Sequence, residues 1–376
     1  MAYHGSNNPS RLGLSATGSA GNEDLFLKVF SGEVLTTFEE NNAMLPLTRQ
    51  RTISSGKTAQ FPVTGVAAAK YHTPGESLFA DEQTSDDPLY LSKINHAERT
   101  IAIDGVLTAS AFLADIDEAK NHYEVRSIYS TEIGRQLAYT ADKNMIRTVI
   151  AGARTTTDRF GTAAGDTAAL IASPYLGGTL CLDGSDANAG DTYQIGGIGD
   201  DDGTVEGSEW VKGIFKMAEL MDSKNVPQHG RYVMMPPAEY YKLITENTDA
   251  INRDYNPEGN GSVASGEVVS VAGCTILKSN HIPNTSETSA TNVHNSSSIN
   301  NDVFGGSGVG YGQADFSETI GIGFQMESVG TVKLLDLAME SEYMMERLGT
   351  LMMARYAMGH GVLREEACYE FSSHTT

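Results

Sequence analysis

The sequence has little of what marks several common classes of protein. Its three cysteines, Cys181, Cys274 and Cys368, lie far apart and form no CxxC pair, which argues against a disulfide framework or a zinc site. No apolar run reaches the roughly eighteen residues of a membrane helix, and the polar N-terminus lacks the apolar stretch of a secretion signal. We therefore expect no membrane partner, and a reducing cytosol suits the chain.

Basic residues are also scarce. The 376 residues include 26 Lys and Arg against 48 Asp and Glu, which gives a formal net charge of −22 at pH 7. Nucleic-acid-binding proteins have the opposite sign, because Lys and Arg neutralise phosphates. The charge argues against DNA binding over most of the surface. It fits either simple solubility or a surface that lies near a polyanion without binding it.

Motifs of catalysis and cofactor binding are missing as well. There is no G-x-S-x-G around any serine and no HExxH. Gly56, Lys57 and Thr58 resemble the end of a phosphate-binding P-loop, but Arg51 stands where that motif needs a glycine. His360, between two glycines, fits a turn or a tightly packed position better than a catalytic one. We predict no catalytic residue and no cofactor.

One acidic segment matches a calcium-binding loop in part. The residues at positions 3, 5, 6 and 12 of an EF-hand loop would be Asp200, Asp202, Gly203 and Glu209. Position 1 is Ile198, whose side chain has no oxygen that could bind the ion. We therefore predict an acidic surface loop here and no metal site.

The most informative absence is local. Residues 41–75 contain no Asp or Glu, although about four would be expected at the average density of the chain. Bases lie in this window, and acids follow directly after it. The candidates for contacts between copies of the chain are therefore Arg49, Arg51, Lys57, Lys70, Glu76, Asp81 and Glu82. A positive segment followed by a negative one can lie across a second copy, so the pattern predicts a self-assembling chain.

Residues 50–100 contain short β-prone pieces but too few apolar residues to form a core. The pieces are 51–53, 59–63 and 93–95, and glycines and prolines separate them. We predict a long extended hairpin that needs another surface to cover it. The apolar run at 100–107 predicts one strand of the main body.

A long amphipathic helix is predicted next. Apolar side chains recur every four residues from Val125 to Val149, and Gly152 follows near the expected end. A helix over 117–151 would be about 50 Å long at 1.5 Å per residue. A helix of this length is long for one compact domain and is better suited to run along the molecule as a structural spine.

The second half of the chain alternates between ordered segments and polar loops. The predicted helices are 209–224 and 238–245, and the predicted strand is 231–235. Residues 268–277 are predicted to form a strand pair around Gly273. Residues 155–207 and 284–315 are rich in small and polar residues and are expected to be loops. The periodicity of 344–356 fits helix and strand about equally.

Several long strings of residues, in the same order along the chain, resemble one protein family. They are LFLKVFSGEVLT (25–36), RTISSGKTAQFPV (51–63), YHTPGE (71–76), IDGVLTA (103–109), DIDEAKNHYEVRS (115–127), VGTVKL (329–334) and ARYAMGHG (354–361). They resemble the major capsid proteins of short-tailed phages of the T7 type, the autographivirus group. The loops at 155–205 and 284–315 and the acidic, Met-rich stretch 340–346 depart from the family.

The resemblance implies an α+β fold of the HK97-like kind. Its expected parts are an N-terminal arm (1–48), an extended hairpin called the E-loop (49–100), a peripheral domain (101–155 and 325–376) that carries the spine helix at about 117–151, and an axial domain (156–324) with long loop insertions. In this fold the C-terminal segment returns beside the spine as strands. We therefore expect strand for 343–358.

The resemblance also implies a function. The chain would be the major head protein of a tailed double-stranded DNA phage, located in the virion capsid and assembled in the host cytoplasm into hexamers and pentamers of an icosahedral shell. The expected partners are further copies of the chain, a scaffolding protein, a portal at one vertex, and packaged DNA held without sequence specificity.

Two alternatives belong to other functional classes. One is a cytosolic hydrolase with an unrecognised site in the loops at 155–205 or 284–315. The other is a host-surface lattice or adhesin protein, against which the missing export signal argues.

Overall fold

The computed structural model describes a large part of the chain. The described residues are 43–65, 67, 69–72, 74–75, 94, 96–116, 126–163, 171–184, 194–199, 202, 204–246, 261–262, 267–268, 270–287, 293–296, 298–301, 303–304, 310–312 and 314–373. The expected N-terminal arm lies outside this set except for its last residues. The expected division into four parts stays a prediction.

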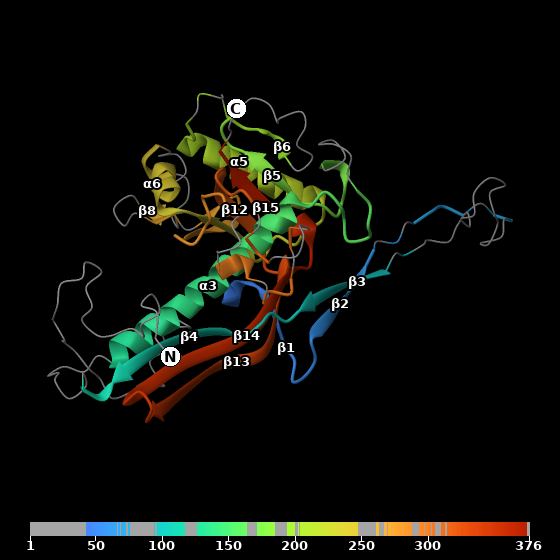
Figure 1. Cartoon of the computed structure of the whole chain (residues 1–376). Coiled ribbons are helices and arrows are strands. Elements are labelled where there is room, and N and C mark those ends of the chain that lie inside the picture. The colour runs from blue at the N-terminus through green and yellow to red at the C-terminus, as the bar shows by residue number, and fades with distance from the viewer. Residues whose placement is uncertain are drawn as a thin grey trace.

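A four-stranded sheet forms the lower part of the molecule in Figure 1. Its strands, in spatial order, are β1 (Arg49–Thr52), β13 (Val329–Met344), β14 (Gly349–Val362) and β4 (Leu107–Ala114). β13 and β14 form a long antiparallel hairpin, and β1 runs parallel to β13. In β14, Met352, Ala354 and Tyr356 are buried at every second position. This period of two confirms the expected strand at 349–358, and β13 covers 343–344. Residues 345–348 are not strand, because the chain turns there between β13 and β14.

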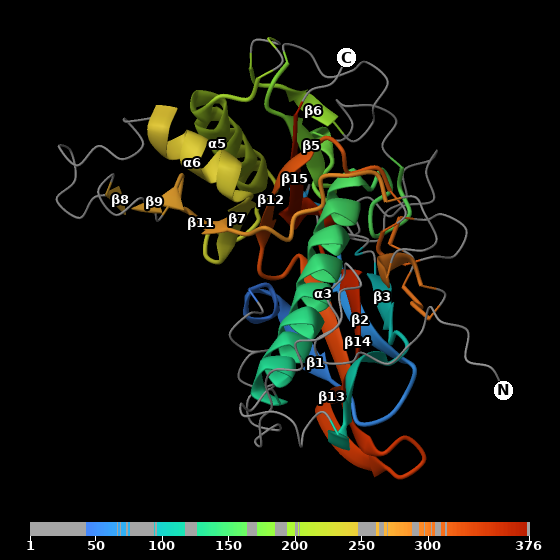
Figure 2. The same ribbon diagram turned by 60° about the vertical axis from the view of Figure 1, so that its left-hand side comes forward.

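A seven-stranded mixed sheet forms the second body. Its strands, in spatial order, are β10 (Ser270–Val271), β11 (Cys274–Lys278), β7 (Arg231–Met235), β12 (Thr319–Gln325), β15 (Cys368–Ser372), β5 (Gly178–Cys181) and β6 (Gln194–Gly197). Helices α5 (Gly207–Ser223) and α6 (Pro237–Glu246) lie together on it (Figure 2). Trp210 and Met217 of α5 are fully buried in the core of this body. The predicted helices at 209–224 and 238–245 and the strand at 231–235 are confirmed.

Two strands lie where loops were expected. β5 and β6 fall inside residues 155–207, so the expectation of loops over that whole range is wrong. All four residues of β5 are buried, because the strand lies inside the sheet and helices cover it, with α3 in contact with β5 and Leu180 in the core shared with α5. A short strand buried on both faces has no alternation of polar and apolar residues, and the surrounding polar composition hid it.

Helix α3 (Arg126–Arg154) connects the two bodies. Its 29 residues span about 44 Å at 1.5 Å per residue. It packs against β14 and β4 of the smaller sheet, and its C-terminal end reaches β15 of the larger one (Figure 2). The buried stripe includes Leu137, Ala141 and Met145, as the four-residue spacing predicted. The helix ends later than the predicted residue 151, and its predicted beginning at 117–125 lies outside the described residues.

A two-stranded hairpin extends away from both bodies (Figure 1). It consists of β2 (Thr58–Thr64) and β3 (His96–Ala102), paired antiparallel with Ala59 opposite Ile101. The expected single strand at 100–107 is wrong, because residues 103–106 break it into the end of β3 and the beginning of β4. β1, at the start of the range 49–100 expected for the hairpin, pairs with β13 of the main body.

The smaller elements complete the described secondary structure. They are the 3₁₀ turns η1 (Leu45–Leu47), η3 (Val293–Asn295) and η4 (Glu365–Ala367) and the short strand pair β8 (Gly261–Ser262) and β9 (Glu267–Val268).

Tight packing also restricts the residue type within the larger sheet. A Cβ on Gly323 of β12 would collide with the sulfur of Met217, so a larger residue there would force the Met217 side chain of α5 to move.

A buried ion pair joins the end of α3 to the larger sheet. Nε and Nη2 of Arg154 donate to the two carboxylate oxygens of Glu370 at 2.8 and 2.7 Å. The hydroxyls of Thr179 and Thr319 donate to the same carboxylate, which is fully buried. Since a buried carboxylate needs such partners, Glu370 is a fixed point between the two bodies.

We predict that Glu370→Ala lowers the free energy of unfolding by about 3–5 kcal/mol, because the change leaves the Arg154 charge without its partner. Urea denaturation of the unassembled chain measures this. Glu219→Ala is the control, since Glu219 forms an exposed pair with Lys216 whose loss should cost less than about 1 kcal/mol. Equal effects of the two substitutions would contradict the assignment.

Candidate assembly interface

The four basic candidates all lie at the surface. Arg49 and Arg51 are on β1, Lys57 precedes β2, and Lys70 lies beyond the far end of β2. Their side chains are exposed. Within the described ranges none of the four forms an ion pair with a carboxylate of its own chain. They are therefore available to a second molecule.

Arg51 has a role inside the chain as well. Its Nη1 donates to the backbone oxygen of Gln60 at 2.9 Å, and its guanidinium lies 5.6 Å from the ring centre of Phe61. These contacts connect β1 of the main body to β2 of the hairpin. The structure therefore brings Arg51 to the hairpin strands, while Arg49 stays on the sheet edge.

The three acidic candidates Glu76, Asp81 and Glu82 lie outside the described residues. A different acidic surface is described at the end of the β13–β14 hairpin. Its exposed carboxylates are Glu340, which pairs with Arg355, Glu342 and Glu346, and Asp336 is exposed farther back along β13. The exposed apolar side chains of Tyr343, Met345 and Leu348 lie at the same end. This surface was not among the sequence candidates, although the unusual composition of 340–346 was a signal for it.

The hairpin β2–β3 buries little of itself. Ala59 and Ile101, near its root, pack into a small cluster with Val332, Ala357 and Leu363. Every second residue of β2 from Thr58 to Thr64 is exposed, and so are His96, Glu98 and Thr100 of β3. A two-stranded ribbon with one polar face and few buried residues is marginally stable alone. Its outer part is suited to lie against another molecule.

Buried ion pairs fix the root of the hairpin. Arg99 of β3 pairs with Glu365 of η4, and the neighbouring Glu366 accepts from Arg159 at 3.0 Å and from Arg364 at 2.9 Å. Both carboxylates are almost fully buried, with side chains 2% and 1% exposed. The guanidinium of Arg159 also lies 4.6 Å from the ring centre of Tyr175. Nothing in the sequence pairs Arg99 or Arg159 with these glutamates, because they are distant along the chain.

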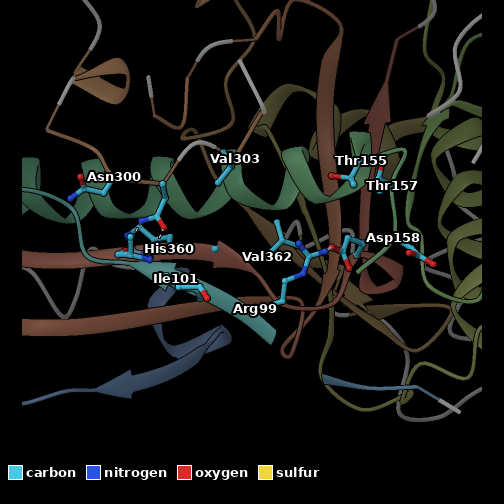
Figure 3. Close-up of a pocket in the computed structure, with 14 residues that line it drawn as sticks. Arg99, Ile101, Thr155, Thr157, Asp158, Asn300, Val303, His360 and Val362 are labelled. Carbon is cyan, nitrogen blue, oxygen red and sulfur yellow. Dashed lines mark hydrogen bonds and ion pairs between the residues drawn. The ribbon is translucent and has the colours of Figure 1, made fainter. Parts of the chain in front are cut away.

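A polar pocket of about 420 Å³ lies beside this root (Figure 3). β3, the segment after α3, the loop around residue 300 and the end of β14 line it. Thr155 and Thr157 lie at one end, and Asn300 and His360 lie at the other. The pocket marks the point where the hairpin, the spine helix and the 284–315 loop meet.

Asp104, in the link between β3 and β4, has an unusual environment. Burial raises the pKa of its carboxyl from 3.8 to about 6, although hydrogen bonds from Tyr311, Asn300 and Asn301 oppose the shift. The Tyr311 hydroxyl donates to Asp104 Oδ2 at 2.6 Å. Burial and the nearby Asp104 raise the pKa of Tyr311 well above its ordinary value, so Tyr311 stays a donor.

A second anchor holds the chain just before β1. The buried carboxylate of Asp142 on α3 accepts from the backbone N–H of Ala43 at 2.9 Å and of Met44 at 3.1 Å. Nδ1 of His281 lies 3.3 Å from the same carboxylate. The contact fixes where the N-terminal segment enters the body.

The partial motifs in the sequence have structural roles. Glu209 caps α5, since its Oε2 accepts from the backbone N–H of Glu206 at 2.9 Å. Gly56 has a φ of 115°, which suits the turn before β2. His360 is buried in β14, with Nδ1 3.0 Å from Thr331 Oγ1, and burial lowers its pKa to about 4. Tight packing is thus the better explanation for His360.

The described residues lack two further features. No group of three or more His, Cys, Asp or Glu side chains among them could hold a metal ion. None of the helices in the described part of the chain is long and apolar enough to cross a membrane.

Comparisons with known proteins agree with this geometry. Residues 60–372 match the family described as "Gp10A-like: Major capsid protein". The major capsid protein of Escherichia phage T7 is 31% identical over 347 residues, which cover 91% of this chain and 90% of that protein. The capsid structure of cyanophage P-SCSP1u is similar with a TM-score of 0.68 and 37% identity, over 99% of this chain and all of that one. The mature capsid of bacteriophage PhiM1 has a TM-score of 0.63 at 16% identity, over 99% and 100% of the two chains.

We predict that the stability of the chain falls as pH rises through the titration of Asp104. The unfolded carboxyl, with its pKa of 3.8, loses its proton before the folded one at about 6, so stability declines between these values and is constant above them. Relative to Asp104→Asn, the native chain should lose about 1 kcal/mol between pH 5 and pH 7.5. Urea denaturation of both proteins measures the difference, and a difference that does not vary with pH would contradict the assignment.

Proposed function

The chain belongs to the Gp10A-like family of major capsid proteins of tailed phages, and we propose that its hairpin β2–β3 connects one copy to the next in the shell. The fold is α+β and HK97-like, as expected, since the similar structures are phage capsids. The chain is therefore a component of the virion capsid. How its surfaces fit together is the subject of the proposal.

One observation carries the proposal: the hairpin has a rigid root and an uncovered outer part. Its root is held by the Arg99–Glu365 pair and the Ala59–Ile101 cluster. Its exposed strands have too little apolar surface to be stable without a second surface. A neighbouring copy supplies that surface in a shell, because every copy is surrounded by others.

The charges indicate that basic side chains of one copy meet acidic side chains of the next. Arg49, Arg51, Lys57 and Lys70 contact carboxylates of an adjacent copy. In the described part of the chain, the acidic end of the β13–β14 hairpin provides exposed carboxylates, among them Glu342 and Glu346. The stretch that holds Glu76, Asp81 and Glu82 is a further candidate acceptor.

The proposed contacts are individually weak and collectively strong. An exposed ion pair contributes about 0–1 kcal/mol, so a pair of copies separates readily. A copy inside a shell makes several such contacts at once, and the later ones form at high effective concentration. Hexamers and pentamers can therefore correct errors during assembly and still give a stable icosahedral shell.

Other partners follow from the same proposal. A scaffolding protein assists assembly in the host cytoplasm, a portal occupies one vertex, and double-stranded DNA fills the interior without sequence-specific contacts. The net charge of −22 supports a wall that encloses DNA without binding it tightly. We assign no catalytic role, and no observation on the described residues favours the hydrolase alternative.

We predict that the double substitution Lys57→Glu and Lys70→Glu reduces the yield of shells at moderate salt while the unassembled chain stays folded. Charge reversal replaces attraction to the neighbouring carboxylates with repulsion, repeated in every copy. Sedimentation and negative-stain electron microscopy measure the yield, and circular dichroism checks the fold.

The matched control reverses two bases of α5, the exposed Lys212 and the half-buried Lys216, to Glu, with the same change in net charge. Lys216 pairs with Glu219, an exposed pair whose loss should cost little. The control should assemble with nearly the native yield. Normal assembly of the Lys57/Lys70 variant, or an equal loss of shell yield in the control, would contradict a specific role for the basic residues of 41–75.

If the shell encloses DNA without binding it tightly, its inner wall should not be basic. A reconstruction of the assembled shell should show an inner surface where acidic residues are at least as frequent as basic ones. An inner surface dominated by Lys and Arg would overturn it, because such a wall would bind phosphates strongly.

A further inference from the structure

The joint between the hairpin and the body is short and is held from one side by a distant loop. Residues 103–106 connect β3 to β4. Four residues outside regular structure can act as a hinge, since a few such residues absorb large changes in backbone angles. Residues 298–301, in the loop at 284–315, lie against this joint.

Asn301 makes the central contact. Its Oδ1 accepts from the backbone N–H of Ala102 at 2.9 Å, and its Nδ2 donates to the backbone oxygen of the same residue at 2.7 Å. A carboxamide offers a donor and an acceptor side by side, as a peptide group does. The side chain thus pairs with the last residue of β3 as a short piece of neighbouring strand would.

The residues on either side of this contact extend it along the link. Nδ2 of Asn300 donates to the backbone oxygen of Ile103 at 2.5 Å. The N–H of Gly105 donates to the oxygen of Ser298 at 2.7 Å. A Cβ on Gly105 would lie 2.8 Å from that of Ser298, so the close approach requires glycine. Each residue from Ala102 to Gly105 is thereby held.

Asp104 and Tyr311 connect the joint to the body. Asp104 Oδ1 accepts from the N–H of Asn300 and from Nδ2 of Asn301, both at 3.0 Å. Its Oδ2 accepts from the Tyr311 hydroxyl, which in turn accepts from the N–H of His360 in β14 at 2.9 Å. A continuous chain of hydrogen bonds therefore runs from β14 through the link to the loop.

The two sides of the joint are held by different means. On one side, Ala59 and Ile101 pack into the apolar cluster with Val332 and Ala357. On the other side, the contacts are hydrogen bonds to the loop. Apolar packing is non-directional, whereas hydrogen bonds fix distances and angles. The apolar cluster and the Arg99–Glu365 pair keep the hairpin attached to the body, and the N–H of Asp104 donates to the oxygen of Met358 in β14 at 3.2 Å. The loop adds the directional contacts on the opposite side of the joint.

We propose that residues 298–301 form a latch that sets the direction of hairpin β2–β3, with Asn301 as its positioning residue, and that this direction determines the curvature of the shell. The proposal rests on the proposed role of the hairpin as the connection between copies. Closure of a shell requires a fixed angle between neighbours, and that angle follows the direction in which the hairpin leaves the body.

The test compares Asn301→Ala with native chain and with Asn284→Ala, a matched substitution of an exposed asparagine in the same loop. Hydrogen exchange of the unassembled chain should show at least tenfold faster exchange at Ala102 and Gly105 in Asn301→Ala, with unchanged exchange in β7. The assembled shells of this variant should show a broader distribution of diameters by electron microscopy. Asn284→Ala should behave as the native chain in both measurements.

A milder variant covers the case in which Asn301→Ala does not fold. Asn300→Ala removes one exposed side chain and its hydrogen bond to the backbone oxygen of Ile103. It keeps the hydrogen bond from the backbone N–H of residue 300 to the Asp104 carboxylate. It should show a smaller shift in the same direction. Native diameters for every folded latch variant would overturn the latch.

The outcomes separate the latch from the function on which it rests. Shells of altered size in the latch variants support both. If the latch variants form shells of the same diameter as the native chain does, the latch is refuted and the proposed function stands. A native chain that forms no shell under any condition contradicts the function itself.

Discussion

A two-stranded hairpin cannot bury both of its own faces, and this constraint explains the arrangement of the chain. β2 and β3 carry too few apolar side chains to form a core of their own. Most buried apolar residues lie in the two bodies connected by α3, and a small separate cluster holds the root of the hairpin. What remains uncovered is the part that a second copy can reach.

The root shows how a weakly stable element is fixed to a stable one. Glu365 and Glu366 carry buried charges that must be paired, and their arginines come from β3, from the segment after α3 and from the residue before η4. Breaking one pair would leave an uncompensated charge in the interior, which is strongly unfavourable. The geometry of the root is therefore specific as well as stable. The same body also fixes the N-terminal segment, through Asp142 on α3.

The sequence predicted those elements in which a periodic apolar pattern continues over many residues, or whose ends carry residues that stop a helix or strand. The four-residue spacing of α3 and the prolines after β7 are examples. β7 lies where expected, and α3 is present over 126–151 but ends three residues later than predicted. β5 escaped prediction, because a strand buried on both faces has no alternation. Periodicity alone also left 344–356 undecided. The resemblance to capsid proteins resolved that segment as strand.

The sign and place of the candidate interface stay a prediction, and the structure shows only where its basic residues lie. The lack of acids in residues 41–75 was visible in the composition, and the four bases of that window are exposed. The buried pairs at the root and the contact of Asn301 with Ala102 join residues far apart in the sequence. Such contacts depend on the three-dimensional fold, so no local pattern could reveal them.

Hydrogen exchange before and after assembly tests the central claim most directly. If a second copy covers the hairpin, the amides of β2 and β3 should exchange at least a hundredfold more slowly in purified shells than in the unassembled chain. The amides of β7, inside the larger sheet, should change little and serve as the internal reference. Equal exchange of β2 and β3 in both states would contradict the claim, because the hairpin would then gain no partner on assembly.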